Sequence, residues 1–155
     1  MPAASSTTDR IEKKVTLKAP RPRVWRALAD ATEFGTWFQI RFDGPFVEGR
    51  TLKGRILVPG YEHVTADFQI VRIQPEDYFA YRWHPYAVDM NKDYSTEPTT
   101  LVEFRLEDTG KETVLTVVES GFDRIPLERR AEAFRMNEGG WTGQMENIRR
   151  HVEAS

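Results

Sequence analysis

Cysteine is absent from the 155-residue sequence. The chain therefore has no disulfide framework, no thiol nucleophile and no metal site built on cysteine. Because disulfides are rare in intracellular proteins, this composition is typical of a cytoplasmic protein, and we expect that location.

Excess charge of one sign and long apolar runs are also absent. Lys and Arg number 22 against 24 Asp and Glu, which gives a formal net charge of −2. We therefore expect no partner that bulk charge would attract, neither nucleic acid nor an anionic membrane. No apolar run approaches the roughly 20 residues that span a bilayer, and residues 1–9 lack the pattern of a secretory signal. We interpret residues 1–9 as a disordered lead-in and residues 10–155 as one domain.

Recognisable catalytic motifs are missing too. The three histidines are His63, His84 and His151, and no two of them have the spacing of a metal-binding pair. The glycines form neither a dinucleotide-binding nor a phosphate-binding loop, and no serine lies in a GxSxG motif. We therefore predict no metal, no cofactor and no catalytic residue that a motif defines.

Hydrophobic periodicity, by contrast, predicts most of the fold. Apolar and polar residues alternate over residues 11–18, which predicts a strand, and Pro22 then suits the first turn of a short helix. Asp30 followed by Glu33 has the spacing of a capping box at the start of a second short helix. Later alternating segments separated by short turns indicate an antiparallel meander. These predicted strands cover residues 51–58, 64–73, 78–84, 100–107 and 113–120.

The last segment predicts one long helix after Pro126. Its core-facing positions recur at steps of four and three residues and comprise Leu127, Ala131, Phe134, Glu138, Trp141, Met145, Ile148 and Val152. Glu138 therefore occupies a core-facing position, and the following Gly139-Gly140 pair is expected to bend the helix or let it approach the sheet. Together these patterns predict an α+β domain with a curved antiparallel sheet against the terminal helix.

Six segments carry a resemblance to a known superfamily. They are KAPRPRVWRALAD (Lys18–Asp30), FGTWF (Phe34–Phe38), GPFVEGRTLKGRI (Gly44–Ile56), FAYRW (Phe79–Trp83), TVVESGF (Thr116–Phe122) and GGWTGQMENIRRHVE (Gly139–Glu153). Here the chain resembles the START-like, birch-pollen-allergen-like (SRPBCC) proteins, and within them the bacterial family similar to the C-terminal domain of the activator of the HSP-90 ATPase. The resemblance implies the helix-grip fold, in which the sheet wraps around the long C-terminal helix and encloses an apolar cavity.

Residues on the inner faces of sheet and helix would line such a cavity. The aromatic candidates for its walls are Trp37, Tyr81, Trp83, Phe104 and Trp141. The alternative is that these rings simply pack in the core, as most buried aromatic residues do. Residues 85–98 form the one long connection, which would either cover the cavity mouth or be an ordinary solvated loop.

Two carboxylates on those inner faces are the candidate polar anchors. Glu119 has the same strand parity as Leu115 and Val117, and Glu138 lies on the helix stripe. A carboxylate buried there must be paired, bound or protonated, and would orient a ligand or act as an acid or base. The alternative for Glu138 is that the glycine pair turns it into water.

We therefore expect a protein that binds an apolar or aromatic small molecule and has no defined reaction. The resemblance suggests a second hypothesis, a module that contacts a chaperone and stimulates its HSP-90-type ATPase. A third hypothesis is a cyclase-like or hydrolase-like enzyme that uses Glu138 or Glu119 as general base. The residues leave open whether the chain is a monomer or a homodimer.

Overall fold

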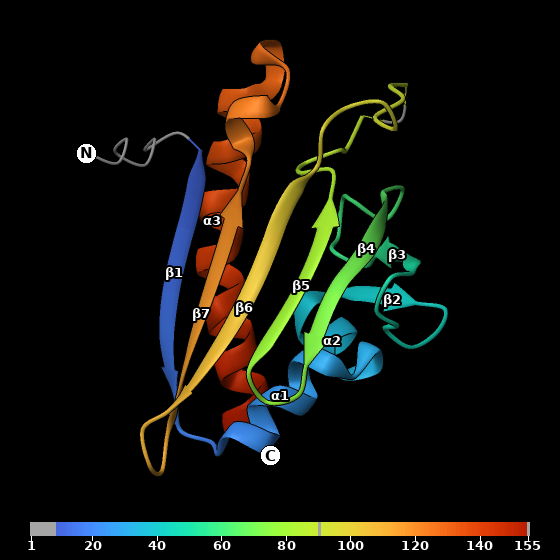
Figure 1. Ribbon diagram of the computed structural model, residues 1–155. Helices are drawn as coiled ribbons and strands as arrows, with labels where there is room; N and C mark the ends of the chain where they lie inside the picture. The colour runs from blue at the N-terminus through green and yellow to red at the C-terminus, as the bar shows by residue number, and fades with distance from the viewer. Residues whose placement is uncertain (1–8, 90, 155) are drawn as a thin grey trace, which may run out of the picture.

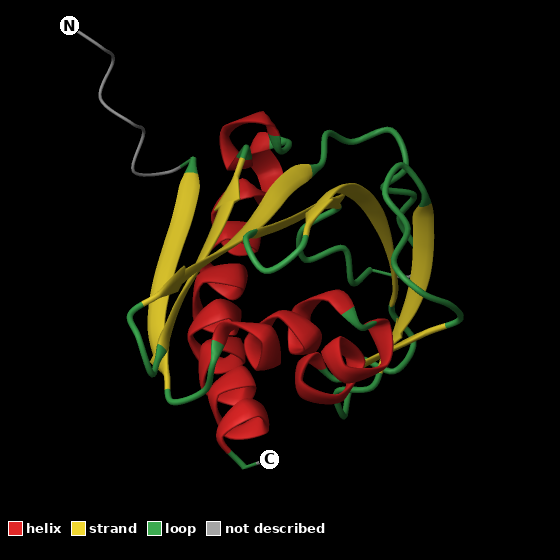
Figure 2. Ribbon diagram, turned by 60° about the horizontal axis from the view of Figure 1, so that its bottom comes forward, coloured by secondary structure: helices red, strands yellow, loops and turns green. Residues whose placement is uncertain are grey.

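The computed structural model describes residues 9–89 and 91–154, which build a curved antiparallel sheet with three helices on its concave side (Figure 1). Figure 2 shows the sheet arching over the long C-terminal helix, with the two short helices beside it. This arrangement confirms the predicted helix-grip fold. Of the predicted disordered lead-in, residues 1–8 lie outside the described residues.

The elements follow the predicted order. The strands are β1 (Arg10–Leu17), β2 (Ile40–Phe42), β3 (Thr51–Ile56), β4 (Thr65–Gln74), β5 (Tyr78–Trp83), β6 (Thr100–Asp108) and β7 (Thr113–Ser120). The helices are α1 (Arg21–Ala29), α2 (Ala31–Phe38) and α3 (Leu127–Glu153), and a 3-10 turn, η1 (Phe122–Arg124), precedes α3. The sequence did not predict β2, because three residues are too few to show an alternating pattern.

All seven strands lie in one sheet in the order β1-β7-β6-β5-β4-β3-β2, and each neighbouring pair is antiparallel. Strands β3 to β7 form the predicted meander and β2 extends it, whereas β1 pairs along its whole length with β7, the last of the described strands. The contact between β1 and β7 extends to Asp9, whose carbonyl accepts hydrogen bonds from the N–H groups of Gly121 and Phe122, both at 3.1 Å. Asp9 is therefore attached to the end of β7 and does not belong to a free lead-in.

Two sequence signals define the short helices. Pro22 lies in the first turn of α1, where its missing N–H is not needed. The Asp30 carboxylate caps α2 by accepting hydrogen bonds from the backbone N–H groups of Thr32 at 2.9 Å and Glu33 at 3.0 Å. The predicted capping box is only half formed, because the Glu33 side chain binds arginines of α1 instead of the Asp30 backbone.

Helix α3 continues without interruption past its glycine pair. A Cβ atom at Gly139 or Gly140 would meet no atom within 4 Å, so the expectation that this pair lets the helix approach the sheet is wrong. Both glycines are exposed on the helix surface. Their small size is therefore not required by packing within the described chain.

The inward stripe of α3 agrees with the prediction at Phe134, which packs against the core, and from Trp141 to the end of the helix, but not at the other predicted positions. Leu127 is 76% exposed, and Glu138 also lies on the exposed side. Steps of four residues back from Trp141 reach Asn137 and Ala133, which hold the inward positions in the first half of the helix. The predicted core-facing position of Glu138 is therefore wrong, and its immediate neighbour Asn137 takes that place.

The core of the fold is an aromatic cluster around Phe34 of α2. Its fully buried ring packs against Trp37 and Phe38 of the same helix and against rings from β2, β4, β5 and β6. Such offset and edge-on pairs bury large apolar areas. This cluster fixes α2 against the concave face of the sheet.

Gly35 lets the chain turn from α2 directly into β2. A Cβ atom at this position would lie 2.2 Å from the carbonyl oxygen of Ile40, which is a backbone atom. Between the two, Gln39 adopts a left-handed conformation with φ 67° and reverses the chain direction. The close approach of the two backbone segments therefore requires glycine inside this short helix.

We predict opposite effects for two Gly→Ala substitutions in helices. Gly35→Ala forces the backbone at Ile40 to move, so we expect the free energy of unfolding to fall by about 1–3 kcal/mol. Gly139→Ala adds a methyl group in open space and favours the helical conformation, so we expect a gain of about 0.5–1 kcal/mol. Urea denaturation followed by circular dichroism measures both changes. An unchanged stability of Gly35→Ala would contradict the close approach.

Candidate functional site

The principal cavity lies where β4 separates from β5. Pairing between these strands ends at Gln69↔Arg82, so the first residues of β4 pair with β3 alone. The cavity has a volume of about 590 Å³, which is within the usual range of small-molecule sites, about 300–1,000 Å³. Successive strand residues face opposite sides, and both Ala66 and Asp67 line the cavity. The cavity therefore reaches from the concave side past β4 to the outer face of the sheet.

Several elements of the fold form the cavity wall. Phe38 comes from the end of α2 and Trp83 from the end of β5, while Met136 and Asn137 come from α3. The end of β3 and its connection to β4 add a further apolar and aromatic group, which comprises Ile56, Val58, Tyr61 and Val64. Most of the remaining lining residues belong to β4 and to the loop of residues 85–98, so this loop covers the cavity instead of extending into solvent.

Arg129 of α3 holds the 85–98 loop in place. Its Nε donates to Glu97 Oε1 at 2.8 Å, and another guanidinium nitrogen donates to the carbonyl of Pro85 at 2.8 Å. The guanidinium also lies over the ring of Tyr94, at 4.8 Å from its centroid. Because the Arg129 and Glu97 side chains are only 12% and 8% exposed, this pair is shielded from solvent and fixes both ends of the loop.

A buried carboxylate lies directly behind the cavity wall. Glu119 of β7 is fully buried and accepts hydrogen bonds from side chains of three other elements. Its donors are Trp83 Nε1 of β5 at 2.7 Å, Thr100 Oγ1 of β6 at 2.5 Å, and Asn137 Nδ2 and Trp141 Nε1 of α3 at 2.9 and 2.8 Å. We call these five residues the Glu119 network. It connects the sheet to α3 at the level of the cavity.

Burial raises the pKa of Glu119 above the ordinary value for glutamate, and the hydrogen bonds that it accepts oppose this shift without cancelling it. Tyr81 is fully buried on the same face of the sheet, two strands away. Burial, together with the charge of Glu119, also raises the pKa of Tyr81 well above its ordinary value. Both groups therefore favour their neutral forms more than exposed residues do.

The geometry of the Glu119 network requires a carboxyl group. Trp83 donates to one carboxyl oxygen and Trp141 to the other. An indole N–H can only donate, so an amide at position 119 would leave one of the two indoles without an acceptor. A protonated carboxyl group keeps both acceptors, since Thr100 can rotate its hydroxyl to accept the proton.

Trp83 and Asn137 belong to the network and to the cavity walls at once. Both line the principal cavity and also a smaller cavity of about 150 Å³, whose other lining residues are Phe38, Gly140, Trp141 and Gln144. Their side-chain nitrogens donate to Glu119, so the other parts of these side chains form the cavity surface. Glu119 thus positions the wall without lining either cavity.

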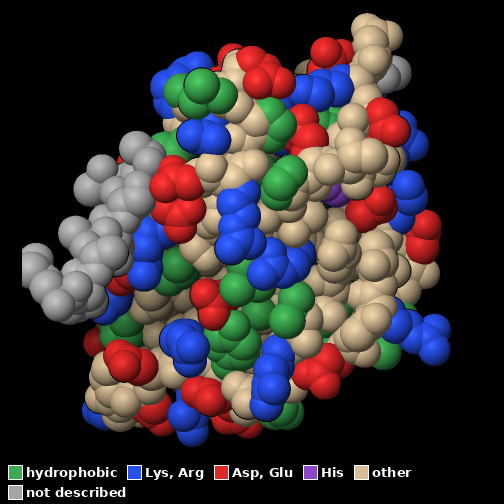
Figure 3. Space-filling view, turned by 45° about the horizontal axis from the view of Figure 1, so that its top comes forward, with side chains coloured by type: hydrophobic (Ala, Val, Ile, Leu, Met, Phe, Trp, Pro, Cys, Tyr) green, Lys and Arg blue, Asp and Glu red, His purple; other side chains and the backbone are tan. Residues whose placement is uncertain are grey.

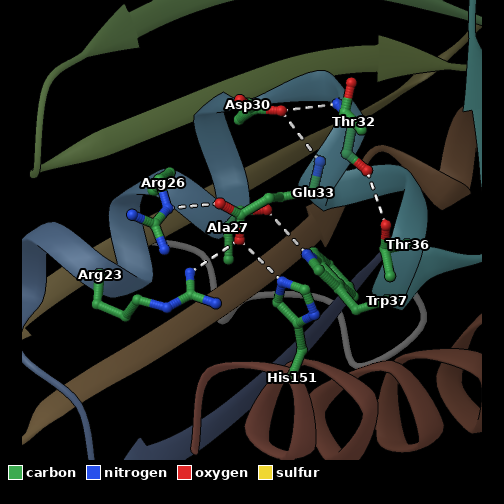
Figure 4. Close-up of polar contacts among 9 residues, drawn as sticks. All are labelled: Arg23, Arg26, Ala27, Asp30, Thr32, Glu33, Thr36, Trp37 and His151. Atoms are coloured by element: carbon green, nitrogen blue, oxygen red, sulfur yellow. Dashed lines mark hydrogen bonds and ion pairs between the residues drawn. The ribbon is translucent and has the colours of Figure 1, made fainter. Parts of the chain in front are cut away.

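Phe38 reaches both cavities because α2 is attached to α3 at two points. Near the start of α2, the Glu33 carboxylate lies 2.9 Å from His151 Nε2 of α3 and also binds two arginines of α1 (Figure 4). At the end of α2, the Gln144 side chain of α3 donates to the carbonyl of Phe38 at 3.1 Å. These contacts determine how far the Phe38 ring extends into the site.

Ionic contacts keep Glu33 charged. Burial alone would raise the pKa of Glu33, but the hydrogen bonds from His151, Arg23 and Arg26 outweigh this effect and hold the pKa below its ordinary value. Next to this cluster, Trp37 Nε1 donates to the carbonyl of Ala27 at 2.8 Å (Figure 4). Trp37 therefore connects α1 and α2 inside the core.

The structure separates the predicted site residues into three groups. Trp83 lines both cavities and Trp141 lines the smaller one, while Glu119 lies behind them. Trp37, Tyr81 and Phe104 lie in the core and line neither cavity, which agrees with the alternative of core packing. Glu138 is 53% exposed, 3.9 Å from Lys13, and contacts no cavity.

Sequence reasoning missed several wall residues. Asn137 was detectable, because steps of four residues from Trp141 place it inward. Phe38 follows Trp37 in a short helix whose burial on both sides hides any stripe. The individual loop residues, such as Tyr86 and Tyr94, carry no periodic signal, since irregular loops have none.

We predict that Glu119→Gln is destabilising although the change is nearly isosteric. One indole N–H would lose its buried acceptor, so we expect the free energy of unfolding to fall by about 1–3 kcal/mol. Glu107→Gln, on the exposed end of β6, is the matched control, and we expect it to change stability by no more than about 0.5 kcal/mol. Urea denaturation at neutral pH compares the two variants. Equal stabilities would contradict the structural role of the network.

The pH dependence of stability tests the raised pKa of Glu119. The folded protein holds this proton more tightly than the unfolded chain, whose glutamate pKa is near 4.5. The stabilising contribution of Glu119 is therefore complete below pH 4.5 and declines as the pH rises through the raised pKa. We expect the stability difference between wild type and Glu119→Gln to shrink over the pH interval above 4.5. A difference that grows over this interval would contradict the raised pKa.

Two features are absent from the part of the chain that the structure describes. Within residues 9–89 and 91–154, no three His, Asp or Glu side chains gather in a way that could hold a metal ion. In the same part of the chain, no helix has the length and apolar character needed to cross a membrane. Figure 3 shows acidic and basic side chains interspersed over the visible face, without a field of one sign.

Comparisons with solved structures show the fold. DynU16, from the dynemicin biosynthetic locus, is 23% identical with a TM-score of 0.71, and the match covers 94% of this chain but 47% of DynU16. The chain thus spans about half of that protein. MLL2253 from Mesorhizobium loti is 18% identical with a TM-score of 0.74, covering 94% of this chain and 98% of MLL2253. The Aha1 dimer from Colwellia psychrerythraea is 18% identical with a TM-score of 0.69, covering 93% and 96%.

The sequence comparison identifies the family. No curated protein matches the chain. The sequence model described as "Activator of Hsp90 ATPase homolog 1-like protein" matches residues 18–153, which include every helix and all strands except β1. The chain therefore belongs to the family of activator of Hsp90 ATPase homolog 1-like proteins.

Proposed function

We propose that the protein binds a small apolar or aromatic molecule in the principal cavity. The observation that carries this proposal is a cavity of about 590 Å³ with large rings in its wall, among them Phe38, Trp83 and Tyr86. A pocket of this volume accommodates a drug-sized molecule, and aromatic walls favour apolar and aromatic ligands.

The rigid attachment of the cavity wall supports binding. Trp83 and Asn137 are held by Glu119, and the 85–98 loop is held by Arg129. A wall that is already ordered loses little conformational entropy when a ligand enters, so more of the contact energy appears as affinity. The buried polar network thus serves recognition by fixing the shape of the site.

The positions of Glu119 and Glu138 favour binding over the enzyme hypothesis, which depends on these two carboxylates. The enzyme hypothesis required Glu119 or Glu138 beside the ligand, but neither residue lines a cavity. A general base must come within hydrogen-bond distance of the proton that it removes, directly or through one water. We therefore retain ligand binding as the proposed function and assign no reaction.

A neutral dye and a cavity-filling variant test the proposal. Nile red fluoresces more strongly in apolar surroundings, so we expect a saturable increase in emission when it is titrated with the wild-type protein. Ala87→Trp introduces a large ring into the cavity wall, and we expect Nile red to bind about tenfold more weakly or worse. Ala131→Trp, exposed on α3 and away from both cavities, is the control and should bind like wild type.

Native mass spectrometry complements the dye titration, because it asks for a ligand retained during purification. An extra mass of small-molecule size, present in wild type and lost in Ala87→Trp, would support the proposal and supply the compound. Nile red that binds equally to wild type and Ala87→Trp would contradict it, since the dye would then bind elsewhere.

A second candidate function is suggested by the family itself, a module that stimulates an HSP-90-type ATPase. The family match and the similarity to the Aha1 dimer favour this candidate. It requires an external surface and not the cavity, so the two functions are separable. We predict that a chaperone-stimulating protein raises the ATPase rate in a saturable way and that Ala87→Trp stimulates equally well. A constant ATPase rate over the whole titration would contradict this candidate.

A further inference from the structure

The charged side chains in the wall of the principal cavity are both acidic. Asp67 comes from the outer face of β4 and Asp93 from the 85–98 loop, and the lining holds neither lysine nor arginine among the described residues. The backbone N–H and the hydroxyl of Ser95 donate to Asp93, which lowers its pKa and keeps it ionised at neutral pH. The wall therefore offers negative charge to a ligand.

The N–H donors of the wall are largely used inside the protein. Trp83 and Asn137 donate to Glu119. His84 Nε2 lies 3.0 Å from the carbonyl of Glu97, which can only accept, so the ring donates there. Gln69 is the remaining wall residue with side-chain N–H groups. A carboxylate or phosphate group on a ligand would thus meet no cation and few free N–H donors.

Polarity changes from the inside of the cavity to its mouth. The inner wall contains the rings of Phe38 and Trp83 together with apolar side chains, whereas the two aspartates are exposed to solvent. Tyr61, a further wall residue, adds a ring whose negative face attracts cations. This order suits a molecule with an apolar body and a positively charged end.

We propose that the cavity selects an aromatic or apolar amine, with the body of the ligand inside and its protonated nitrogen at the mouth near Asp67 and Asp93. The inference rests on the proposed ligand-binding function and specifies its ligand class. It assigns recognition of the charge to two residues that no sequence pattern singles out.

Neighbouring cations limit the size of the expected preference. Lys53 lies 3.5 Å from Asp67, but the two side chains are 63% and 50% exposed, so solvent weakens their attraction. Lys92 and Arg129 both pair with Glu97 and do not line the cavity. Viewed from a distance, these positive charges nearly cancel the negative charges of the neighbouring acidic residues. The preference for an amine therefore arises from direct contact between the amine and the two aspartates, and it is moderate.

A matched set of three indoles tests the inference. Tryptamine carries a cationic side chain, indole-3-propionate an anionic one, and 3-ethylindole a neutral one on the same ring system. Isothermal titration calorimetry with the full chain at pH 7 and low salt measures their dissociation constants. We expect tryptamine to bind about tenfold more tightly than indole-3-propionate, with 3-ethylindole between them.

Two aspartate variants locate the source of the preference. Asp93→Asn removes the charge but keeps an oxygen for the backbone N–H of Ser95, so the loop should keep its shape. We expect it to reduce the tryptamine preference about threefold, and Asp67→Asn to act in the same direction. Asp89→Asn is the matched control, because Asp89 caps Asn91 in the same loop and does not line the cavity. It should retain the wild-type preference.

The outcomes distinguish this inference from the proposed function. Binding of 3-ethylindole without any advantage for tryptamine overturns the amine inference and leaves the proposed function in place. Tighter binding of indole-3-propionate overturns it as well. Failure of all three indoles to bind counts against both proposals. An equal loss of preference in Asp93→Asn and Asp89→Asn would show that the general charge of the loop, and not its contact with the ligand, is responsible.

Discussion

The burial of the Glu119 carboxylate is the constraint that determines how β5, β6, β7 and α3 pack together. A carboxyl group without access to water must be satisfied by protein donors, because an unsatisfied one costs several kcal/mol. Its donors come from β5, β6 and α3, so these elements must meet at one point and in one register. The aromatic core around Phe34 adjoins this network, since the rings of Phe38 and Tyr81 both pack against Trp83. The Glu119 network therefore supplies directional contacts where apolar packing gives way to a cavity.

In the function that we propose, this division of roles would make the site both rigid and selective. The N–H groups of Trp83 and Asn137 hold the wall and are not free for a ligand, so recognition of polar groups shifts to the outer rim. The loop that forms this rim is itself attached to α3 through Arg129. A change of loop residues would alter the ligand preference without disturbing the network, which is how binding sites on a stable scaffold commonly diversify.

The sequence predicts the helices and strands of the fold better than it predicts the residues that line the cavity. Alternation predicted the strands of the meander, and parity placed Glu119 on the inner face, because both follow from local spacing. The position of the cavity depends instead on where β4 leaves β5. The pairing of β4 with β5 is irregular between Ile70 and Arg72, next to that point. Such irregularities bend strands without any strong sequence signal. Tyr81 and Phe104 therefore share the predicted inner face yet lie in the core below the cavity.

The pairing of β1 with β7 has a consequence for how the chain is made. During synthesis β1 emerges before the other strands of the sheet. Among the described residues it pairs with β7 alone, which ends at Ser120, and the helix that covers the concave face follows later still. Contacts between residues so far apart in sequence slow the folding of small domains, since a long loop must close before they form. The nascent chain thus carries an unpaired strand of alternating apolar and polar residues until β7 has been synthesised, and the sheet is complete only when β7 leaves the ribosome.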